Sequence, residues 1–321
     1  MSKVIFIIGG AGYIGSHMVK HADKAGYEVI TLDNLSTGHK DAVKYGKFEF
    51  CDLSNIKQLN ILFNEYKPDA ILHFGALSEV SESVTNPYKY YKNNVSGTIN
   101  LLKAMLDHDC NKIIFSSTAA VFGNPKYIPI DENHPKNPIN PYGRSKLMVE
   151  QLLEDFDLAY GLKYLIFRYF NAAGHDIDGE LRERHNPETH LLPLIIEAVN
   201  DRNKSVNIFG TDYDTKDGTC VRDFIHVDDL CEAHLKGLEL LFDSEKGNLS
   251  DSFNLGNGAG FSVKEVIENV KELTNNDFKV VEKPRRKGDP ALLVASNDKA
   301  EKKLNFSPKL NKIADIIRTL I

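Results

Sequence analysis

Long apolar runs and a strong charge of either sign are both missing from this chain of 321 residues. No apolar stretch approaches the roughly 18 residues that a membrane-spanning helix needs, so we expect no membrane partner. The opening run VIFIIGG is too short for a secretory signal and leads directly into glycines. A formal net charge of −6 gives no general attraction to nucleic acid, so no nucleic-acid partner is expected.

Cysteine is also scarce, and histidine is not clustered. The four cysteines, Cys51, Cys110, Cys220 and Cys231, are widely scattered and form no CxxC pair. This pattern favours a reducing, cytoplasmic location over a disulfide framework or a zinc site. Apart from His17 and His21, which are four positions apart, the 11 histidines are spread along the chain, and no metal is expected.

The first half of the chain alternates short apolar runs with helical patterns. Apolar residues recur at helical spacing, for example at Ile14, Met18, Val19 and Ala22. Such alternation predicts βαβ units and a parallel sheet covered on both faces. The runs that predict strands are 4–8, 28–32, 47–50, 70–74, 112–117 and 164–170.

Beyond about residue 171 the elements become shorter, and Gly, Asp, His and Pro become frequent. We therefore predict an α/β fold with two parts. A Rossmann-type, doubly wound domain that binds a dinucleotide spans residues 1–170. A smaller mixed α/β domain for the substrate spans residues 171–321. Some segments of this range can belong to the first domain.

A glycine-rich stretch, GGAGYIGS, follows the first predicted strand and leads into a helix. Glycines at 9, 12 and 15 let the backbone approach a pyrophosphate closely, and the helix N-terminus attracts the anion. Asp33 ends the second predicted strand and is placed to accept hydrogen bonds from an adenosine ribose. Its charge would repel a 2′-phosphate, which favours NAD over NADP. The alternative is a tight turn beside a solvated aspartate.

Two further groups carry chemistry. The stretch INPYGRSKLMVE places Tyr142 four positions before Lys146 at the start of a predicted helix, so both lie on one helical face. The ammonium favours the phenolate, which would make a base, although such a pair is also an ordinary surface feature. Thr118 ends the fifth predicted strand, at the sheet edge where α/β enzymes place reactive groups. Its alternative role is to cap a backbone group.

Seven motifs together resemble a known family: GGAGYIGS, DNLSTGH, FSSTAAVFG, PYGRSK, RYFN, VRDFIHVDDL and RRKGD. From about residue 3 to 305 the chain is similar to the extended short-chain dehydrogenase/reductases. The order and spacing of the motifs are most similar to those of the UDP-galactose (UDP-glucose) 4-epimerases. The resemblance implies NAD-dependent oxidation of a UDP-hexose at C4, rotation of the 4-keto sugar and reduction on its other face. It also implies a role in galactose metabolism and a homodimer formed through helices near 89–107 and 143–159.

The resemblance assigns roles to individual residues. Lys146 is expected to bind the nicotinamide ribose and to lower the pKa of Tyr142. Residues with implied catalytic roles are Tyr142, Lys146 and Thr118. Those implied for the cofactor are Gly9, Gly12, Tyr13, Ile14, Gly15, Asp33, Asn34, Asp52, Leu53, Phe74, Asn93, Lys146 and Phe170. Those implied for the substrate are Thr118, Tyr142, Asn171, His190, Leu191, Arg222, Arg286, Asp289 and Leu293.

Three residues depart from the family pattern. Ser78 stands where a lysine that reaches the cofactor is usual, so retention of NAD is expected to be weaker. His190 replaces an asparagine near the diphosphate, and its ring is able to donate a similar hydrogen bond. Leu293 occupies the position of a gate beside the sugar C2 substituent. Its intermediate size leaves the acceptance of N-acetyl groups open.

Several other functions compete with this interpretation. A 4,6-dehydratase has an acidic pair after the strand-end threonine, whereas Ala119 and Ala120 follow Thr118 here and exchange no proton. Epimerases of UDP-N-acetylglucosamine or of UDP-pentoses remain alternatives. A non-catalytic NAD-sensing protein is a less favoured one, because Tyr142 and Lys146 are both retained. A dehydrogenase that releases NADH is a further alternative.

Overall fold

A computed structural model describes residues 2–243, 250–286 and 289–321. The chain divides into two compact units, each assembled from three stretches. The first unit contains Met1–Gly123, Pro135–Arg168 and Cys231–Phe253, and the second contains Asn124–His134, Tyr169–Leu230 and Asn254–Ile321. The division into two separately folding domains at residues 170 and 171 stays a prediction.

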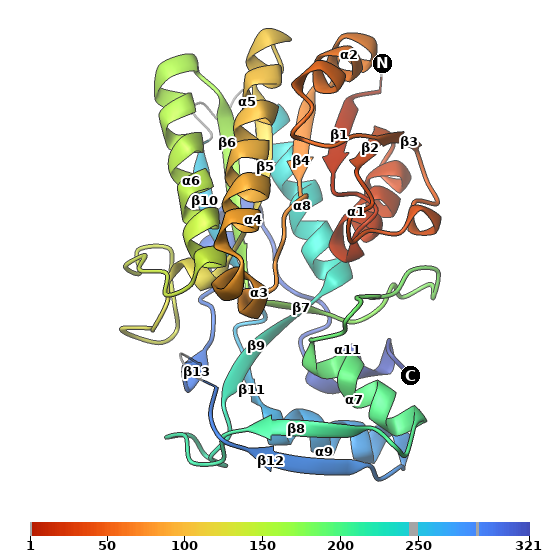
Figure 1. The fold of residues 1–321 in the computed structure, drawn as a ribbon, viewed down its shortest axis with the longest axis vertical. Coiled ribbons are helices and arrows are strands. Elements are labelled where there is room, and N and C mark those ends of the chain that lie inside the picture. The colour runs from red at the N-terminus through yellow and green to blue at the C-terminus, as the bar shows by residue number, and fades with distance from the viewer. Residues whose placement is uncertain (1, 244–249, 287–288) are drawn as a thin grey trace. The chain divides into compact units, whose positions relative to one another are not determined.

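The first unit is built on a seven-stranded sheet in the order β10-β6-β5-β4-β1-β2-β3 (Figure 1). β1 pairs in parallel with β2 and β4, β2 with β3, and β4 with β5. The predicted Rossmann-type α/β fold is therefore confirmed. The strands are β1 (Val4–Ile8), β2 (Glu28–Asp33), β3 (Lys47–Phe50), β4 (Ala70–His73), β5 (Lys112–Thr118), β6 (Lys163–Tyr169) and β10 (Asp251–Leu255).

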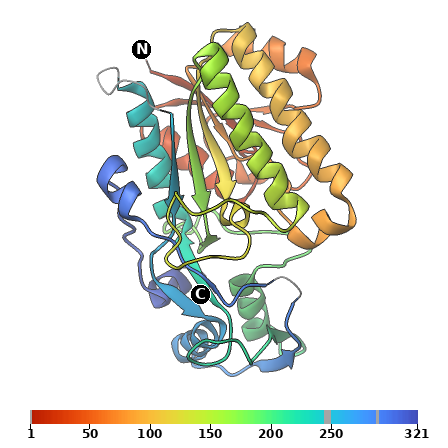
Figure 2. The ribbon, with the colours of Figure 1, turned by 90° about the vertical axis from the view of Figure 1, so that its left-hand side faces the viewer.

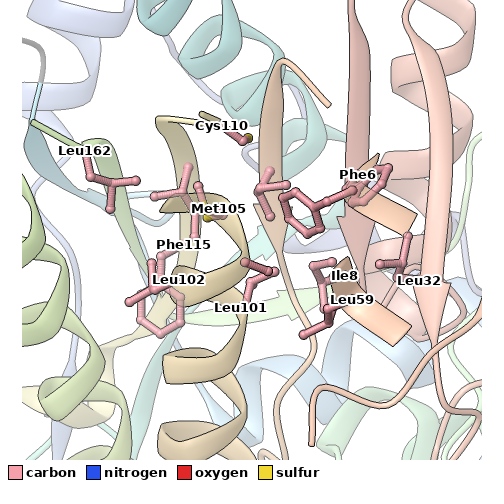
Figure 3. Close-up of a cluster of buried hydrophobic side chains, with 14 of the residues drawn as sticks. Phe6, Ile8, Leu32, Leu59, Leu101, Leu102, Met105, Cys110, Phe115 and Leu162 are labelled. Carbon is pink, nitrogen blue, oxygen red and sulfur yellow. The ribbon is translucent and has the colours of Figure 1, made fainter. Parts of the chain in front are cut away.

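Helices lie on both faces of this sheet (Figures 1 and 2). Helices α2, α5 and α6 share a buried core with one face, which includes Phe6, Ile8, Leu101 and Phe115 (Figure 3). Helices α1 and α8 lie against the other face. The helices of this part are α1 (Tyr13–Lys24), α2 (Ile56–Tyr66), α3 (Val80–Thr85), α4 (Pro87–Tyr90), α5 (Gly97–Asp107), α6 (Pro141–Tyr160) and α8 (Val227–Phe242). Short helical turns occur at Lys40–Ala42 and Ala119–Val121, and Tyr91–Ser96 forms a π-helical turn between α4 and α5.

The apolar residues explain why these strands are buried on both sides. Side chains alternate between the two faces of a strand. In β1, Phe6 and Ile8 belong to the core beneath α2 and α5, while Ile5 and Ile7 are equally buried. Strands that are apolar at every position are typical of a parallel sheet between two helical layers. Among the described residues, no helix combines the length and the apolar character that crossing a membrane requires.

The second unit is a mixed α/β structure organised around β9 (Val221–His226). β9 pairs in parallel with β7 (Asn171–Ala173) and β13 (Leu292–Leu293), and antiparallel with β11 (Gly260–Ser262). A separate parallel pair joins β8 (Ser205–Phe209) and β12 (Lys279–Lys283). The helices here are α7 (Leu191–Asn200), α9 (Val263–Thr274), α10 (Asp298–Leu304) and α11 (Ile313–Arg318). The apolar faces of α7, α9 and α11 form a core with β9 that includes Ile195, Phe224, Val266 and Ile316.

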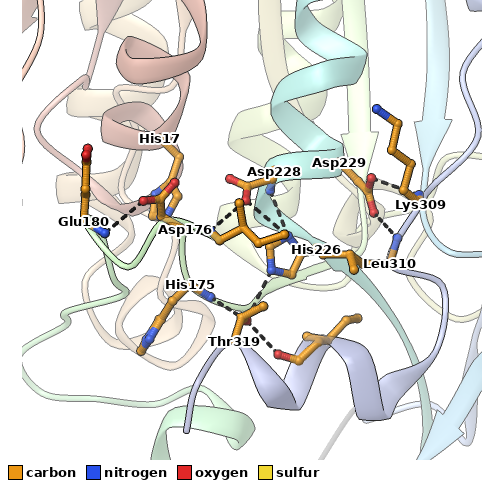
Figure 4. Close-up of polar contacts among 12 residues, drawn as sticks. His17, His175, Asp176, Glu180, His226, Asp228, Asp229, Lys309, Leu310 and Thr319 are labelled. Atoms are coloured by element: carbon orange, nitrogen blue, oxygen red, sulfur yellow. Dashed lines mark hydrogen bonds and ion pairs between the residues drawn. The ribbon is translucent and has the colours of Figure 1, made fainter.

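The motif VRDFIHVDDL anchors the C-terminal residues within this unit (Figure 4). The Nδ1 atom of His226 accepts from the backbone N–H of Asp228 at 3.1 Å, so its Nε2 carries the hydrogen that faces the Thr319 hydroxyl at 3.2 Å. Asp229 accepts from the backbone N–H groups of Lys309 and Leu310, each at 2.9 Å. Much of this motif therefore has a structural role.

Candidate active site

The glycine turn after β1 has two positions that the protein's own packing restricts to glycine. Gly9 has a φ of +77°, and a Cβ there would lie 2.6 Å from the backbone nitrogen of Gly75. A Cβ at Gly15 would lie only 2.1 Å from the carbonyl oxygen of Gly9. Both glycines are needed to bring the start of α1 against β1 and β4.

Gly12 is different, because nothing in the protein excludes a side chain there. Its φ of −80° suits any residue, and a Cβ would meet only the Gly9 oxygen, at an ordinary 3.4 Å. Close approach of a ligand therefore explains this glycine better than folding does. Gly12 is the N-cap of α1, followed by Tyr13 and Ile14, and the N–H groups and dipole of a helix start attract phosphate. The turn fits the pyrophosphate of a dinucleotide.

Asp33 ends β2 beside this turn. Its two carboxylate oxygens accept from the backbone N–H groups of Ala11 at 3.0 Å and Leu35 at 2.7 Å. A carboxylate oxygen accepts more than one hydrogen bond, so the group is held in place and retains acceptor capacity for ribose hydroxyls. Burial raises the pKa of Asp33, and the two backbone hydrogen bonds oppose that shift.

The remaining cofactor candidates of the first unit lie at or near the carboxyl ends of the neighbouring strands. Asn34 donates to Asp52 at 2.8 Å, which links the ends of β2 and β3. The carbonyl oxygen of Leu53 accepts from Asn100 of α5 at 2.9 Å. Phe74 directly follows β4, and Asn93 lies in the π-helical turn, where it donates to Asn94 at 3.0 Å.

The side chains of Tyr142 and Thr118 lie close enough for the threonine hydroxyl to affect the pKa of the phenol. Local structure explains their proximity. Asn140 caps α6 by accepting from the N–H of Gly143 at 2.8 Å. A Cβ on Gly143 would lie 2.6 Å from the carbonyl oxygen of Ala120, so the first turn of α6 packs directly against the end of β5. Thr118 also accepts from the N–H of Ala120 at 3.1 Å, so it has the capping role as well as the contact with tyrosine.

Lys146 lies buried one turn further along α6. Its Nζ donates to the carbonyl oxygen of Ser116 at 2.6 Å and lies 4.8 Å from the centre of the Phe115 ring. Burial lowers the pKa of Lys146 to about 7, and the nearby Glu150 carboxylate opposes that shift. Its charge is thus sensitive to what lies beside it.

The expectation that Lys146 lowers the pKa of Tyr142 concerns the enzyme with NAD bound and stays a prediction, because the protein groups alone have the opposite effect. Burial raises the pKa of Tyr142 above its usual 10.0, and the Thr118 hydroxyl opposes the rise. The Lys146 ammonium donates to Ser116 instead. Stabilisation of a phenolate therefore requires positive charge from a bound ligand or a change in the partner of Lys146.

Asn94 is a buried residue of this site that the sequence did not reveal. Its amide accepts from the N–H of Leu77 at 2.9 Å and donates to the Leu77 carbonyl and to the Ser145 hydroxyl, both at 3.0 Å. Ser145 in turn donates to the Tyr142 carbonyl oxygen at 2.7 Å. Asn94 thereby fixes the first turn of α6, which carries Tyr142 and Lys146.

Glu150 is a second buried residue that the sequence did not reveal. It is one turn beyond Lys146 and accepts from the Ser117 hydroxyl at 2.6 Å and from Arg168 at 2.9 and 2.8 Å. Lys136 donates to it at 3.3 Å. Buried charges are tolerated when paired and hydrogen-bonded in this way. The network fastens α6 to β5 and β6 beneath the candidate catalytic residues.

In the second unit, β9 gathers several of the substrate candidates. The Arg222 guanidinium forms an ion pair with Asp289 and donates to the carbonyl oxygen of Val221 at 2.7 Å. Leu293 lies opposite Arg222 in the pairing of β13 with β9. Asn171 donates to the carbonyl oxygen of Asp223 at 2.8 Å.

The other candidates of this unit lie in separate places. The Arg286 guanidinium stacks 3.8 Å from the centre of the Phe209 ring. Lys287 and Gly288, from the same RRKGD motif, lie outside the described residues. Phe170 donates its N–H to Leu255 at 3.2 Å. His190 and Leu191 stand at the N-terminus of α7, where His190 is the N-cap.

A glycine turn for pyrophosphate, an acid for the adenosine ribose and a Tyr-Lys-Thr set at the end of β5 define the class of short-chain dehydrogenases/reductases. Comparison with known proteins gives the family. The profile of the NAD dependent epimerase/dehydratase family matches residues 5–256, and the chain belongs to this family. NAD is therefore its cofactor, as predicted.

Full-length relatives agree in both sequence and structure. The chain is 47% identical to the UDP-glucose 4-epimerase of Halalkalibacterium halodurans, over 98% of this chain and 93% of that protein. The crystal structure of UDP-glucose 4-epimerase from Brucella ovis in complex with NAD is 44% identical and superposes with a TM-score of 0.95, over 99% of this chain and 97% of that one. The UDP-Glc/GlcNAc 4-epimerase of Campylobacter jejuni is 46% identical, with a TM-score of 0.86 over 99% and 98% of the two chains.

Proposed function

We propose that this protein interconverts UDP-glucose and UDP-galactose, with NAD as its cofactor. The observation that carries the proposal is the placement of Tyr142 beside Thr118, one helical turn from the buried Lys146, at the carboxyl end of β5. The names of the full-length relatives support the same reaction. The prediction of an NAD-dependent isomerase agrees with these relatives, which are UDP-glucose 4-epimerases.

In the proposed mechanism, Tyr142 as a phenolate removes the proton of the sugar 4-hydroxyl. Thr118 donates a hydrogen bond to the oxygen that becomes a carbonyl. The chemistry that NAD would supply when bound is the acceptance of a hydride from C4 and its return to the other face. Tyr142 then gives the proton back, so no net oxidant is consumed. Ala119 and Ala120, which follow Thr118, offer no group for proton exchange at C5 or C6, which argues against the dehydratase reaction of this family.

We further propose that the predicted residues hold the two ligands. Gly12 and Asp33 receive the pyrophosphate and the adenosine ribose, and Lys146 receives the nicotinamide ribose. Guanidinium groups match phosphate oxygens with several donors, which suits Arg222 and Arg286 to the substrate diphosphate. Because the 4-keto sugar has to rotate, we expect strong contacts with the nucleotide and weak contacts with the hexose. The other proposed cofactor contacts are Gly9, Tyr13, Ile14, Gly15, Asn34, Asp52, Leu53, Phe74, Asn93 and Phe170, and the other substrate contacts are Asn171, His190, Leu191, Asp289 and Leu293.

We propose a homodimer in the cytoplasm, with a role in galactose metabolism. Apolar side chains on α5 and α6 of the first unit, Ile99 and Met148, are 42% and 43% exposed, which supports a partner on that face. All four cysteines are free and buried, which suits a reducing compartment.

A second candidate activity is the epimerisation of UDP-N-acetylhexosamines. Two observations favour it: the 46% identity to an enzyme named for both UDP-Glc and UDP-GlcNAc, and Leu293 at the proposed gate, which is smaller than an aromatic residue. Its side chain is half-buried in β13. The acetamido group needs more room at C2 than a hydroxyl, so this activity depends on the size of residue 293.

Direct assay distinguishes these possibilities. Purified protein with NAD is incubated separately with UDP-galactose and with UDP-N-acetylgalactosamine, and the products are resolved by anion-exchange chromatography. We expect conversion of UDP-galactose to UDP-glucose with no accumulation of reduced nicotinamide. An oxidised sugar formed together with an equal amount of NADH would instead show a dehydrogenase. Conversion of the acetylated substrate at a comparable kcat/KM would establish the second activity.

A further inference from the structure

The loop that precedes α7 contains a closed set of polar contacts among four side chains. Glu183 is buried, with a side chain that is 1% exposed. Its Oε1 contacts the Nδ1 atoms of both His190 and His185, the latter at 3.2 Å. The other acid, Glu188, lies 3.5 Å from the same Nδ1 of His185.

Glu188 also fixes the backbone at the start of α7. Its Oε1 accepts from the N–H groups of Thr189 at 2.8 Å and of His190 at 2.9 Å. The two glutamates therefore act on different parts of His190. Glu188 holds its backbone at the N-cap position, and Glu183 holds its ring.

This arrangement determines which atom of His190 a ligand meets. The ring lies against Glu183 through Nδ1, yet its side chain is 53% exposed. A histidine ring has two nitrogens on opposite edges, and the hydrogen bond of one sets the role of the other. Nε2 is consequently the nitrogen presented at the surface, next to the free N–H groups of α7.

We propose that Glu183 is a positioning residue for substrate binding: its buried carboxylate accepts from Nδ1 of His190 and orients the ring so that, when both ring nitrogens carry a hydrogen, Nε2 donates to the substrate diphosphate. This inference rests on the proposed function, because the diphosphate is that of the UDP-sugar. The start of α7, a helix of ten residues, adds a favourable dipole for the same anion. A flexible histidine at a helix start would have to be ordered on binding, whereas this one is held beforehand.

The state of Glu183 agrees with this role. Burial raises the pKa of Glu183, but hydrogen bonds from His185 and His190 outweigh it and leave the pKa lowered. A buried carboxylate that remains charged needs such partners. The Glu183 and Glu188 carboxylates, both next to Nδ1 of His185, raise the pKa of His185 to about 9, so a charged His185 offsets their negative charge.

A metal ion is the competing explanation for the same side chains. One ligand atom from each of Glu183, His185, Glu188 and His190 lies within 4.8 Å of the others, and nitrogen with oxygen ligands suits zinc and similar ions. The hydrogen bonds that Glu188 accepts from the backbone and the pairing of His185 with two acids already account for the cluster. Metal content is therefore one outcome of the test.

The test compares Glu183→Gln, His190→Ala and the double variant with the wild-type enzyme and NAD. The dissociation constant of UDP is measured by calorimetry, and kcat and KM are measured with UDP-galactose. We expect both single variants to weaken UDP binding and raise KM about tenfold, with kcat changed less than threefold. The double variant should be no worse than His190→Ala, because Glu183 acts through that ring.

Glu180→Gln is the matched control, since it makes the same chemical change at an exposed site of the same loop and should behave like the wild type. Glu183→Asp keeps the charge and should fall between the wild type and Glu183→Gln, which separates positioning from misfolding. Additive losses in the double variant, or an unchanged KM in Glu183→Gln, would overturn the inference. So would a stoichiometric metal in the wild type that Glu183→Gln lacks. UDP binding with the expected pattern but without epimerisation would refute the reaction and leave the positioning role intact.

Discussion

At the scale of single residues, the protein groups alone do not stabilise the phenolate that the mechanism requires of Tyr142. Tyr142 must lose its proton to act as a base, yet burial raises its pKa and only Thr118 opposes this. Lys146 is close by but is bonded to Ser116, with a pKa lowered to about 7. A neighbouring ligand is therefore able to stabilise the positive charge of Lys146.

Removing the phenolic oxygen tests the assigned base. Tyr142→Phe should lower kcat for UDP-galactose by 10² to 10⁴, roughly what general acid–base catalysis contributes, while bound NAD is retained. Tyr160→Phe provides the control, because Tyr160 lies on the same helix and is 62% exposed. Near-normal turnover of Tyr142→Phe would remove this tyrosine from the mechanism.

The lowered pKa of Lys146 predicts how stability depends on pH without NAD. The folded pKa of about 7 lies below the ordinary lysine value of 10.5, so the unfolded chain binds more protons between these values. The contribution of this group to stability therefore rises as pH increases from about 7 toward 10.5. Lys146→Met abolishes that contribution. In thermal unfolding between pH 7 and 9, the Tm of the wild type should rise relative to that of the variant, and parallel curves would contradict the assignment.

At the scale of elements, the three glycines of the turn between β1 and α1 have different roles, some in folding and one in ligand binding. Gly15 has no room for a Cβ because of the Gly9 carbonyl oxygen, whereas Gly12 has room within the protein. Glycine thus serves two purposes within six positions of the chain, and the structure distinguishes them.

Alanine substitutions make that distinction measurable. Gly12→Ala should fold with a Tm close to that of the wild type but lose most NAD binding, since the methyl group occupies space needed by the pyrophosphate. Gly15→Ala should lower the Tm by several degrees because the backbone has to move. Thermal shift with and without NAD reports both effects. If Gly12→Ala binds NAD normally, the pyrophosphate lies elsewhere.

The loop before α7 should show an unusual histidine. The pKa of His185, about 9, lies above its ordinary 6.5, so its contribution to stability is complete below about pH 6.5 and is lost as pH rises through about 9. The pKa of Glu188, lowered to about 2, adds stability that is complete above about 4.5 and is lost toward pH 2. In an NMR titration, one imidazole should titrate near pH 9, and that signal should be absent from His185→Asn. If every histidine titrates below pH 7.5, the ion pairs of this loop do not form in solution.

The sequence predicted the strands and the position of the site because both follow from simple patterns. Apolar runs and glycine turns are local, and the carboxyl ends of parallel strands necessarily share an edge, which brings Gly9, Asp33 and Thr118 to the same side of the sheet. Asn94 could not be found this way. It lies in the π-helical turn Tyr91–Ser96, which breaks the helical period and turns its side chain inward to Leu77 and Ser145.

Other features depended on contacts between separate segments. Glu150 and Arg168 are distant in sequence, and only the packing of α6 on β6 makes them a buried pair. The cluster around Glu183 has the spacing Glu-x-His-x-x-Glu-x-His, which a search for paired histidines four apart passes over. The direction of the Tyr142 pKa without NAD could not be predicted, because helical spacing does not show which acceptor a lysine contacts.

At the scale of the whole molecule, the remaining question is what covers the exposed side of α5 and α6. Single exposed apolar residues are common on monomers, so Ile99 or Met148 alone decides nothing. Several of them on the outer side of one helical layer, which also includes Tyr88 of α4, are typical of an interface between subunits. The proposed homodimer requires that this face be the one buried.

A charge placed on that face should separate the subunits. Burying an unpaired carboxylate in an apolar interface is strongly unfavourable, so Met148→Glu should convert a dimer into a monomer. Light scattering after gel filtration should give twice the 36.0 kDa of one chain for the wild type and a single chain mass for the variant. Ile177→Glu is the control, since Ile177 is 70% exposed and belongs to the second unit. A wild type that is monomeric at micromolar concentration, or a Met148→Glu variant that stays dimeric while Ile177→Glu dissociates, would place the interface elsewhere or show that there is none.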